Sequence, residues 1–193
     1  RLKRHSVLLL LMEALCVLHF DYKQNQNNTI STMEIKIEQP DLVLCDFTNP
    51  QHCAALCDLI NEYITHPMGG GEPLSDSQKI RLIDGLEFHP KAITLFVLKD
   101  GAIAGVLNAF VNFSTFKCKS MINVHDVFVS DAYRGKGLGR KLIQGIIEIG
   151  KNLSCGKITL EVRVDNPTAQ NLYKSEGFEE GNDPMYFWTR YLH

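Results

Sequence analysis

Apolar residues recur along the chain at spacings that alternate between the period of a strand and the period of a helix. Residues 41–47, DLVLCDF, form a short apolar run typical of a strand. Asn49 and Pro50 then supply a cap and a first-turn proline, and apolar side chains recur at helical spacing to about Ile64. The pattern therefore predicts a strand that is followed directly by an amphipathic helix.

A second helix is expected after the glycine-rich loop HPMGGGEPL, residues 66–74. Ser75 and Gln78 have the spacing of a capping box, and the helix that they open should end near the His89-Pro90 step. Residues 93–113 predict a hairpin, because Asp-Gly at positions 100 and 101 is a pair that suits a tight turn between two strands.

The pattern then places a basic glycine loop between a strand and a helix. MINVHDVFV, residues 121–129, is rich in β-branched residues and predicts a strand. It leads into RGKGLGRK, residues 134–141, and an apolar stripe from Leu138 to Leu153 predicts a long helix beyond it.

The last third predicts a further strand, helix and strand. KITLEVRV, residues 157–164, alternates with period two, and Asn166 with Pro167 opens a short helix that ends at Gly177. MYFWTRYL, residues 185–192, predicts a closing strand. The element order is β-α-α-β-β-β-α-β-α-β, which indicates the α/β class with a mixed (α+β) sheet.

Residues 1–32 differ in character from the rest of the chain. A cationic start and an apolar run are similar to a signal or anchor segment, but the run is short for a membrane span and Glu13 interrupts it. A polar linker follows, and Met33 opens the domain sequence. Two interpretations stay open, an artefact of the start site or an interfacial helix, and we do not expect a membrane span.

Composition narrows the classes of function. The 193 residues have a formal net charge of -2, which gives no general attraction to nucleic acid. His52, Cys53 and Cys57 are a conceivable ligand cluster, but both thiols lie on the apolar face of the first helix, so we expect core cysteines and no metal. Unpaired cysteines favour a reducing, cytoplasmic location.

The loop RGKGLGRK fits neither the Walker nor the Rossmann glycine spacing, since Arg140 stands where each template needs glycine. At a strand-to-helix junction, however, the first-turn N–H groups have no intrahelical acceptors. Gly135, Gly137 and Gly139 would let an anion approach them, and nearby cations, Lys141 among them, would add attraction. The loop has the chemistry of a pyrophosphate cradle.

Two stretches resemble the central motifs of the GNAT superfamily of N-acetyltransferases, whose donor is acetyl-CoA. They are VHDVFVSDAYRGKGLGRKLI, residues 124–143, and ITLEVRVDNPTAQNLYKSEGF, residues 158–178. The resemblance implies a GNAT-like central, twisted and mostly antiparallel sheet flanked by helices. Residues 33–193 would then form the N-acetyltransferase domain, with residues 1–32 as an N-terminal extension.

The resemblance also implies roles for individual residues. The CoA pyrophosphate would bind the loop formed by Arg134, Gly135, Lys136, Gly137, Leu138, Gly139 and Arg140. Pantetheine would pair with the backbone of Phe128 and Val129, Val127 would donate its N–H to the thioester oxygen, and Asn166 would contact CoA.

The catalytic groups follow from the chemistry of acetyl transfer. Tyr173 matches a family tyrosine that protonates the departing thiolate, and core packing is its alternative role. The base that deprotonates the amine is His125 or Asp126, with Glu161 a weaker candidate. Strand alternation points His125 and Asp126 to opposite faces unless a bulge turns one of them.

The favoured hypothesis is therefore transfer of the acetyl group of acetyl-CoA to a primary amine of a small molecule or peptide, by direct attack in a ternary complex. A non-catalytic acyl-CoA-binding or sensor domain of the same fold is the alternative, and a nucleotide or nucleic-acid binder is disfavoured by charge. Tyr63, His66 and Glu72 near the flexible loop 66–74, and the segment 114–120, are the expected acceptor side. A homodimer is compatible with these expectations.

Overall fold

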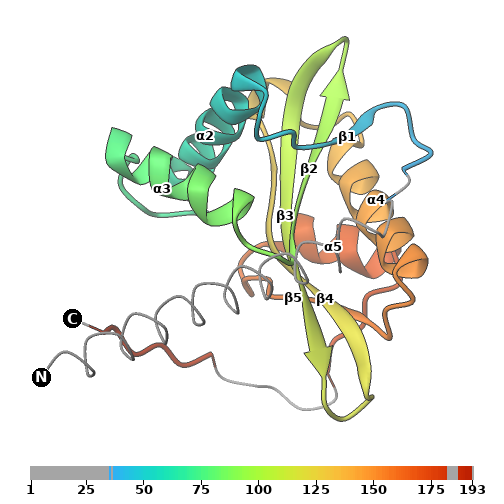
Figure 1. The fold of residues 1–193 in the computed structure, drawn as a ribbon. Coiled ribbons are helices and arrows are strands. Elements are labelled where there is room, and N and C mark those ends of the chain that lie inside the picture. Colours follow the sequence, from blue (N-terminus) through green and yellow to red (C-terminus); the bar gives the residue numbers. More distant parts are fainter. Residues whose placement is uncertain (1–34, 36, 182–186, 193) are drawn as a thin grey trace, which may run out of the picture. The chain divides into compact units, whose positions relative to one another are not determined.

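The structure is a computed structural model that describes residue 35 and residues 37–181 and 187–192. The chain divides into two units, Arg1–Glu161 and Val162–His193, and each is described by itself. The first unit contains a five-stranded sheet in which every strand lies beside its neighbour in chain order. It also contains the helices that cover this sheet (Figure 1).

The first four strands of the sheet pair antiparallel, whereas the fifth lies parallel to the fourth. Such a parallel edge requires a crossover, which the helix between the last two strands supplies. The elements are β1 (Leu42–Leu44), α2 (Pro50–Thr65), α3 (Asp76–Glu87), β2 (Ala92–Lys99), β3 (Ala102–Ser114), β4 (Lys119–Val129), a 3-10 turn η1 (Asp131–Tyr133), α4 (Leu138–Asn152) and β5 (Ile158–Leu160), with α5 (Pro167–Ser175) in the second unit.

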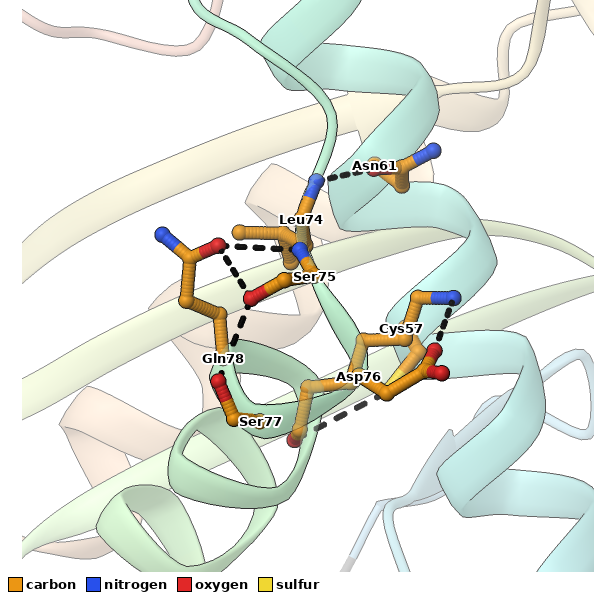
Figure 2. Close-up of polar contacts among 8 residues, drawn as sticks. Cys57, Asn61, Leu74, Ser75, Asp76, Ser77 and Gln78 are labelled. Atoms are coloured by element: carbon orange, nitrogen blue, oxygen red, sulfur yellow. Dashed lines mark hydrogen bonds and ion pairs between the residues drawn. The ribbon is translucent and has the colours of Figure 1, made fainter.

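The predicted caps form at the starts of α2 and α3. The side chain of Asn49 accepts from the N–H of Gln51 at 2.9 Å, which satisfies a first-turn donor of α2. At α3, the Gln78 side chain accepts from the N–H of Ser75 at 2.9 Å and from its hydroxyl at 2.7 Å (Figure 2). Figure 2 also shows Asn61 of α2 bonded to the N–H of Leu74, at 2.7 Å, which ties the incoming loop to α2.

The hairpin between β2 and β3 turns at the predicted pair. Asp100 and Gly101 both have positive φ, 53° and 81°. Two consecutive positive φ values characterise the two-residue turn whose twist matches that of the adjoining strands. The prediction from the Asp-Gly pair is confirmed.

Two predicted strands differ from the structure. The strand over residues 157–164 is three residues long, Ile158–Leu160, and Val164 beyond it is 96% exposed. Of the expected closing strand, residues 185 and 186 lie outside the described residues, and residues 187–192 form no strand. Aromatic and β-branched residues favour strands mainly through pairing and packing, so their presence alone does not produce a strand.

Helices cover both faces of the sheet, so apolar side chains are buried between sheet and helix on each side. On one face α2 and α3 bury a cluster with alternate residues of β2, β3 and β4. On the other face lies α4, whose Gly145 is so close to the sheet that an added Cβ would lie 3.0 Å from Leu95. The cluster beneath α2 and α3 contains Leu56, Leu59, Ile60, Leu86, Phe96, Val106 and Phe128.

Candidate active site

The edge of β4 is open where the chain approaches the glycine loop. Pairing between β4 and β5 ends at Val124 and Leu160, whereas β4 continues to Val129. The Ser130 N–H donates to Ala104 of β3 at 3.0 Å. Because peptide groups alternate along a strand, the N–H groups of Val127 and Val129 point to the opposite, open edge. An extended ligand chain can add there as a strand does.

The backbone N–H of Phe128 points in the opposite direction to those of Val127 and Val129. Its N–H faces β3, and its ring is 3% exposed beneath α2, where it stacks on Tyr63 at 5.2 Å. Phe128 therefore packs α2 against the sheet, which leaves Val127 and Val129 as the better placed partners for the predicted pantetheine pairing. The Val129 carbonyl already accepts from Arg134 Nε at 3.1 Å and keeps one lone pair.

The glycine loop lies between β4 and α4 as predicted, although the 3-10 turn η1 stands between β4 and the loop. Gly135 and Gly137 have φ of 74° and 75°, a region that favours glycine, and Gly137 is the N-cap of α4. No heavy atom lies within 4 Å of a Cβ built on either residue, so the space above both is open. Leu138 is buried and anchors the first turn, in which Gly139 also lies. The arrangement leaves first-turn N–H groups of α4 accessible to an anion.

Two of the four cations of the loop, Arg134 and Lys141, form ion pairs with carboxylates. Arg134 pairs with Asp131 at 2.9 Å, hydrogen-bonds His66 at 3.0 Å and lies 5.4 Å from the centre of the Phe128 ring. Lys141 pairs with Asp41, and its hydrogen bond and charge hold the pKa of that carboxyl below its usual value.

The other two cations lie at the surface of the loop. Lys136 lies over the Tyr133 ring at 5.3 Å and is exposed, as is Arg140 in the first turn of α4.

A β-bulge in β4 settles the orientation of the two candidate bases. Asn108 of β3 pairs with Asp126 and the next residue, Ala109, pairs with Val124, so His125 is the extra residue. Asp126 is therefore on the same face as Phe128, toward α2 and α3. His125 is exposed, and its ring meets Phe110 edge-on at 5.2 Å, which places it toward that face as well. The bulge brings the two candidates to one side.

A polar chain that the sequence analysis did not identify crosses the sheet beneath Asp126. Asn108 donates from Nδ2 to Asp126 Oδ2 at 3.0 Å, and Thr94 donates from Oγ1 to Asn108 Oδ1 at 2.8 Å. Thr94 and Asn108 are 4% and 2% exposed. The available signal was a single polar residue inside each of the apolar runs AITLFVLK and GVLNAFV.

The expected acceptor side, around loop 66–74, is bonded both to α2 and to the η1 turn that precedes the loop RGKGLGRK. Loop 66–74 is therefore held by hydrogen bonds rather than being a free connection. Gly71 donates to Ile64 O at 2.9 Å, and a Cβ on Gly69 would lie 2.1 Å from Tyr63 O. Glu62 of α2 accepts from the Asp131 N–H at 2.9 Å. The glycines therefore permit a close backbone approach, and the C-terminal end of α2 is joined to η1.

The remaining candidates for the acceptor side and for the base are exposed residues. Glu72 is exposed in its loop, and in the segment 114–120 Phe116 is 98% exposed. Glu161, the weaker base candidate, is exposed and accepts from Asn123 Nδ2 at 3.5 Å.

Asn166 and Tyr173 belong to the second unit, so their part in acetyl transfer stays a prediction. Asn166 is the N-cap of α5 and accepts from the Ala169 N–H at 3.1 Å. Gly177, at φ 85°, ends the helix as predicted, because its N–H and that of Phe178 bond back to the last turn. The Tyr173 ring is 5.9 Å from that of Phe178 and is half-buried.

The cysteines on α2 contact backbone carbonyls. Cys53 donates to Phe47 O at 3.3 Å, and burial raises the pKa of both Cys53 and Cys57. Burial also raises the pKa of Cys45 to about 12. Within the described residues no group of three or more His, Cys, Asp or Glu side chains could hold a metal ion. In the same part of the chain, no helix combines the length and apolarity that crossing a membrane requires.

Comparison with known proteins gives a consistent result. A Bacillus subtilis protein provisionally named ribosomal protein bS18-alanine N-acetyltransferase is 30% identical over 101 residues, 52% of this chain and 63% of the relative. Thialysine N-epsilon-acetyltransferase of Bos taurus is 32% identical over 71 residues, 37% and 41% of the two chains. The chain thus spans less than two thirds of the length of these curated relatives.

A solved structure shares the fold. An aminoglycoside acetyltransferase from an uncultured soil metagenomic sample superposes with a TM-score of 0.66 at 15% identity, covering 78% of this chain and 95% of that chain. Residues 53–178, more than half of the chain, match the Acetyltransferase (GNAT) family, and they include β4, the glycine loop and α5. On this match the chain belongs to the Acetyltransferase (GNAT) family.

Proposed function

We propose that the protein transfers the acetyl group of acetyl-CoA to a primary amine by direct attack in a ternary complex. The observation that carries this proposal is the open edge of β4 running into the glycine N-terminus of α4. A molecule that combines an extended amide chain with a diphosphate matches both parts. The pantetheine arm would pair along Val127 and Val129, and the diphosphate would bind at residues 135–140.

The chemistry at the thioester requires a donor for the oxygen and an acceptor for the proton of the amine. The N–H of Val127 points to the open edge and would stabilise the oxyanion that forms when the amine attacks the carbonyl carbon. The amine reacts through its lone pair, and Asp126 or His125 takes its proton directly or through one water. The C–N bond forms in this attack, and the C–S bond breaks when the oxyanion collapses back to a carbonyl and expels the thiolate.

The departing thiolate takes up a proton to leave as CoA. A phenol is a suitable donor for it, and Tyr173 is the residue that we assign to this step. The products are then the N-acetylated amine and free CoA, and an acceptor that arrives as an ammonium ion also releases one proton to solvent.

The acceptor is proposed at the level of its chemistry. The relatives' names specify an alanine of a ribosomal protein and thialysine, whose acceptors are primary amines. The α2 and α3 face carries Asp126, and a carboxylate near the reacting amine favours an acceptor that arrives as a cation. A small molecule or a peptide terminus meets this requirement.

Acceptor profiling tests the proposal. The purified full chain would be mixed with acetyl-CoA and a panel of amino acids, polyamines, aminoglycosides and peptides, and free CoA thiol would be read as it forms. We expect thiol release that depends on one class of amine. Binding of acetyl-CoA without thiol release for any amine would contradict the proposal and support the non-catalytic sensor.

Replacing Tyr173 with Phe tests the proton donor. Tyr173→Phe should lower kcat by about 10²-fold, the scale of one general acid, because the thiolate leaves without a proton source. Affinity for acetyl-CoA, measured by calorimetry, should stay unchanged. Tyr191→Phe is the control, since Tyr191 is 79% exposed and has no assigned role. Full turnover in Tyr173→Phe would remove the role of Tyr173.

A further inference from the structure

We propose that Asn108 and Thr94 are positioning residues that hold the Asp126 carboxylate in a fixed orientation for the acceptor amine. The inference rests on the proposed acetyl transfer and goes beyond it, because neither residue lies in the glycine loop or in the candidate catalytic set. It also selects Asp126, rather than His125, as the group that the fold orients.

The three residues form one continuous row across the sheet. Thr94 of β2 is the register partner of Asn108 in β3, and Asn108 is the register partner of Asp126 in β4. The two side-chain bonds, 2.8 Å and 3.0 Å, therefore run perpendicular to the strands. The next row on this face is wholly apolar, with Phe96, Val106 and Phe128. A polar row beside it costs desolvation unless each group is paired, and here each is.

The direction of the two bonds follows from the chemistry of the groups. An ionised carboxylate can only accept, so the amide atom that faces Asp126 must be the Nδ2 donor. Asn108 Oδ1 then faces Thr94, whose hydroxyl must donate to it. The carboxylate thus selects the amide orientation, because the reverse one would place Oδ1 against it, and the Thr94 hydroxyl holds the amide in that orientation by donating to Oδ1.

The bulge and the polar row act on the same carboxylate. His125, as the extra residue, turns Asp126 to the α2 and α3 face, and the Asn108 amide then holds Oδ2. The geometry leaves Asp126 Oδ1 as the oxygen that can accept from an amine or a water. In the described part of the chain, the His125 ring contacts the edge of Phe110, and no comparable hydrogen bond holds it.

The test compares Thr94→Val, which keeps the shape and removes the hydroxyl, with Thr94→Ser, which keeps the hydroxyl. Thr94→Val should lower kcat by about tenfold, the worth of one hydrogen bond, because the Asn108 amide loses the bond that holds its Oδ1 and so holds the carboxylate less firmly. The KM for acetyl-CoA should stay within about twofold of the starting value, and Thr94→Ser should recover most of kcat. If Thr94→Val does not fold, Thr94→Cys replaces it, because a thiol is a weak donor of similar size.

A matched control is available in the same sheet. Thr159 of β5 accepts from Asn123 Nδ2 of β4 at 3.2 Å, a second cross-strand Thr–Asn pair that does not reach Asp126. Thr159→Val should leave kcat unchanged. A purely structural role for Thr94 predicts instead that both Val variants lose turnover only in proportion to their folded fraction, measured by thermal unfolding, and that outcome would overturn the inference.

A double-mutant cycle tests whether Thr94 acts through Asp126. In an Asp126→Asn background, adding Thr94→Val should change kcat by less than about twofold, because the group being positioned is already altered. A full tenfold loss in that background would overturn the inference. If the unmodified chain releases no thiol with any amine, the proposed function fails and takes the inference with it. Full kcat in Thr94→Val of an active chain overturns the positioning role alone.

Discussion

At the scale of single residues, the glycines of the loop serve two separate requirements. Gly137 at φ 75° is needed for the backbone path into α4, and the open space above it is needed for an anion to reach the first-turn N–H groups. Gly101 in the β2–β3 turn has the first requirement without the second, with φ 81° and equally open surroundings. The two positions allow backbone strain to be separated from ligand binding.

Gly137→Val should weaken acetyl-CoA binding by more than about tenfold, because the side chain would occupy the approach to the helix N-terminus. Calorimetry of the folded variant measures it. Gly101→Val is the control: both variants should lose about 1–2 kcal/mol of the free energy of unfolding through positive φ. Only Gly137→Val should lose affinity. Equal affinity in the two variants would show that the loop does not hold the diphosphate.

At the scale of elements, the bulge in β4 separates two functions of one strand. From Ile122 to Val124 the strand pairs on both sides, and beyond His125 no strand pairs with its outer edge in the described part of the chain. The faces of Val124 and Asp126 would be the same in a regular strand, and the extra residue makes them opposite. A single inserted residue therefore places the Asp126 side chain on the α2 and α3 face. The N–H groups of Val127 and Val129 point to the open edge.

Deletion of His125 should give a regular ladder, since Val124 and Asp126 already pair with consecutive residues of β3. We expect the deletion variant to stay folded, with thermal unfolding within a few degrees of the starting chain, and to lose acetyl transfer because a regular strand lacks the extra local twist that a bulge gives to the edge at Val127 and Val129. His125→Ala keeps the bulge and should keep acetyl-CoA binding in calorimetry. A fully active deletion variant would refute the importance of the bulge.

At the scale of the whole molecule, the two faces of the first unit have separate assignments. In the proposed transfer, the α4 face would supply the helix N-terminus for the donor, and the α2 and α3 face would supply Asp126 for the acceptor. The described hydrophobic core extends from Leu42 to Ile149. The buried groups that stabilise the domain thus lie well inside the predicted boundary at Met33.

If residues 1–32 are an extension, as the sequence predicts, a chain that begins at Met33 should unfold cooperatively at the same temperature as the 193-residue chain, because it keeps every described core residue from Leu42 to Ile149. Differential scanning calorimetry of both chains measures this, and thiol release compares their turnover. A large fall in the unfolding temperature would assign residues 1–32 to the domain rather than to an extension.

The limits of sequence-based prediction follow from which signals are local. Asn49, Ser75 and the Asp-Gly turn were predicted because each acts within four residues of itself. The short β5 and the missing strand over residues 187–192 were not predicted, since a strand depends on a partner that alternation does not specify.

For the candidate site, the sequence by itself determined the glycine junction, the strand before it and the residue types available for acetyl transfer. Only the tertiary structure decided that His125 is the extra residue of a bulge, and that Thr94 and Asn108 stand in one row with Asp126. The physical reason is that register couples strands far apart in the chain: Thr94 and Asp126 act together through Asn108 only because pairing aligns them, whereas the helix N-terminus at Gly137 is formed by its own neighbours.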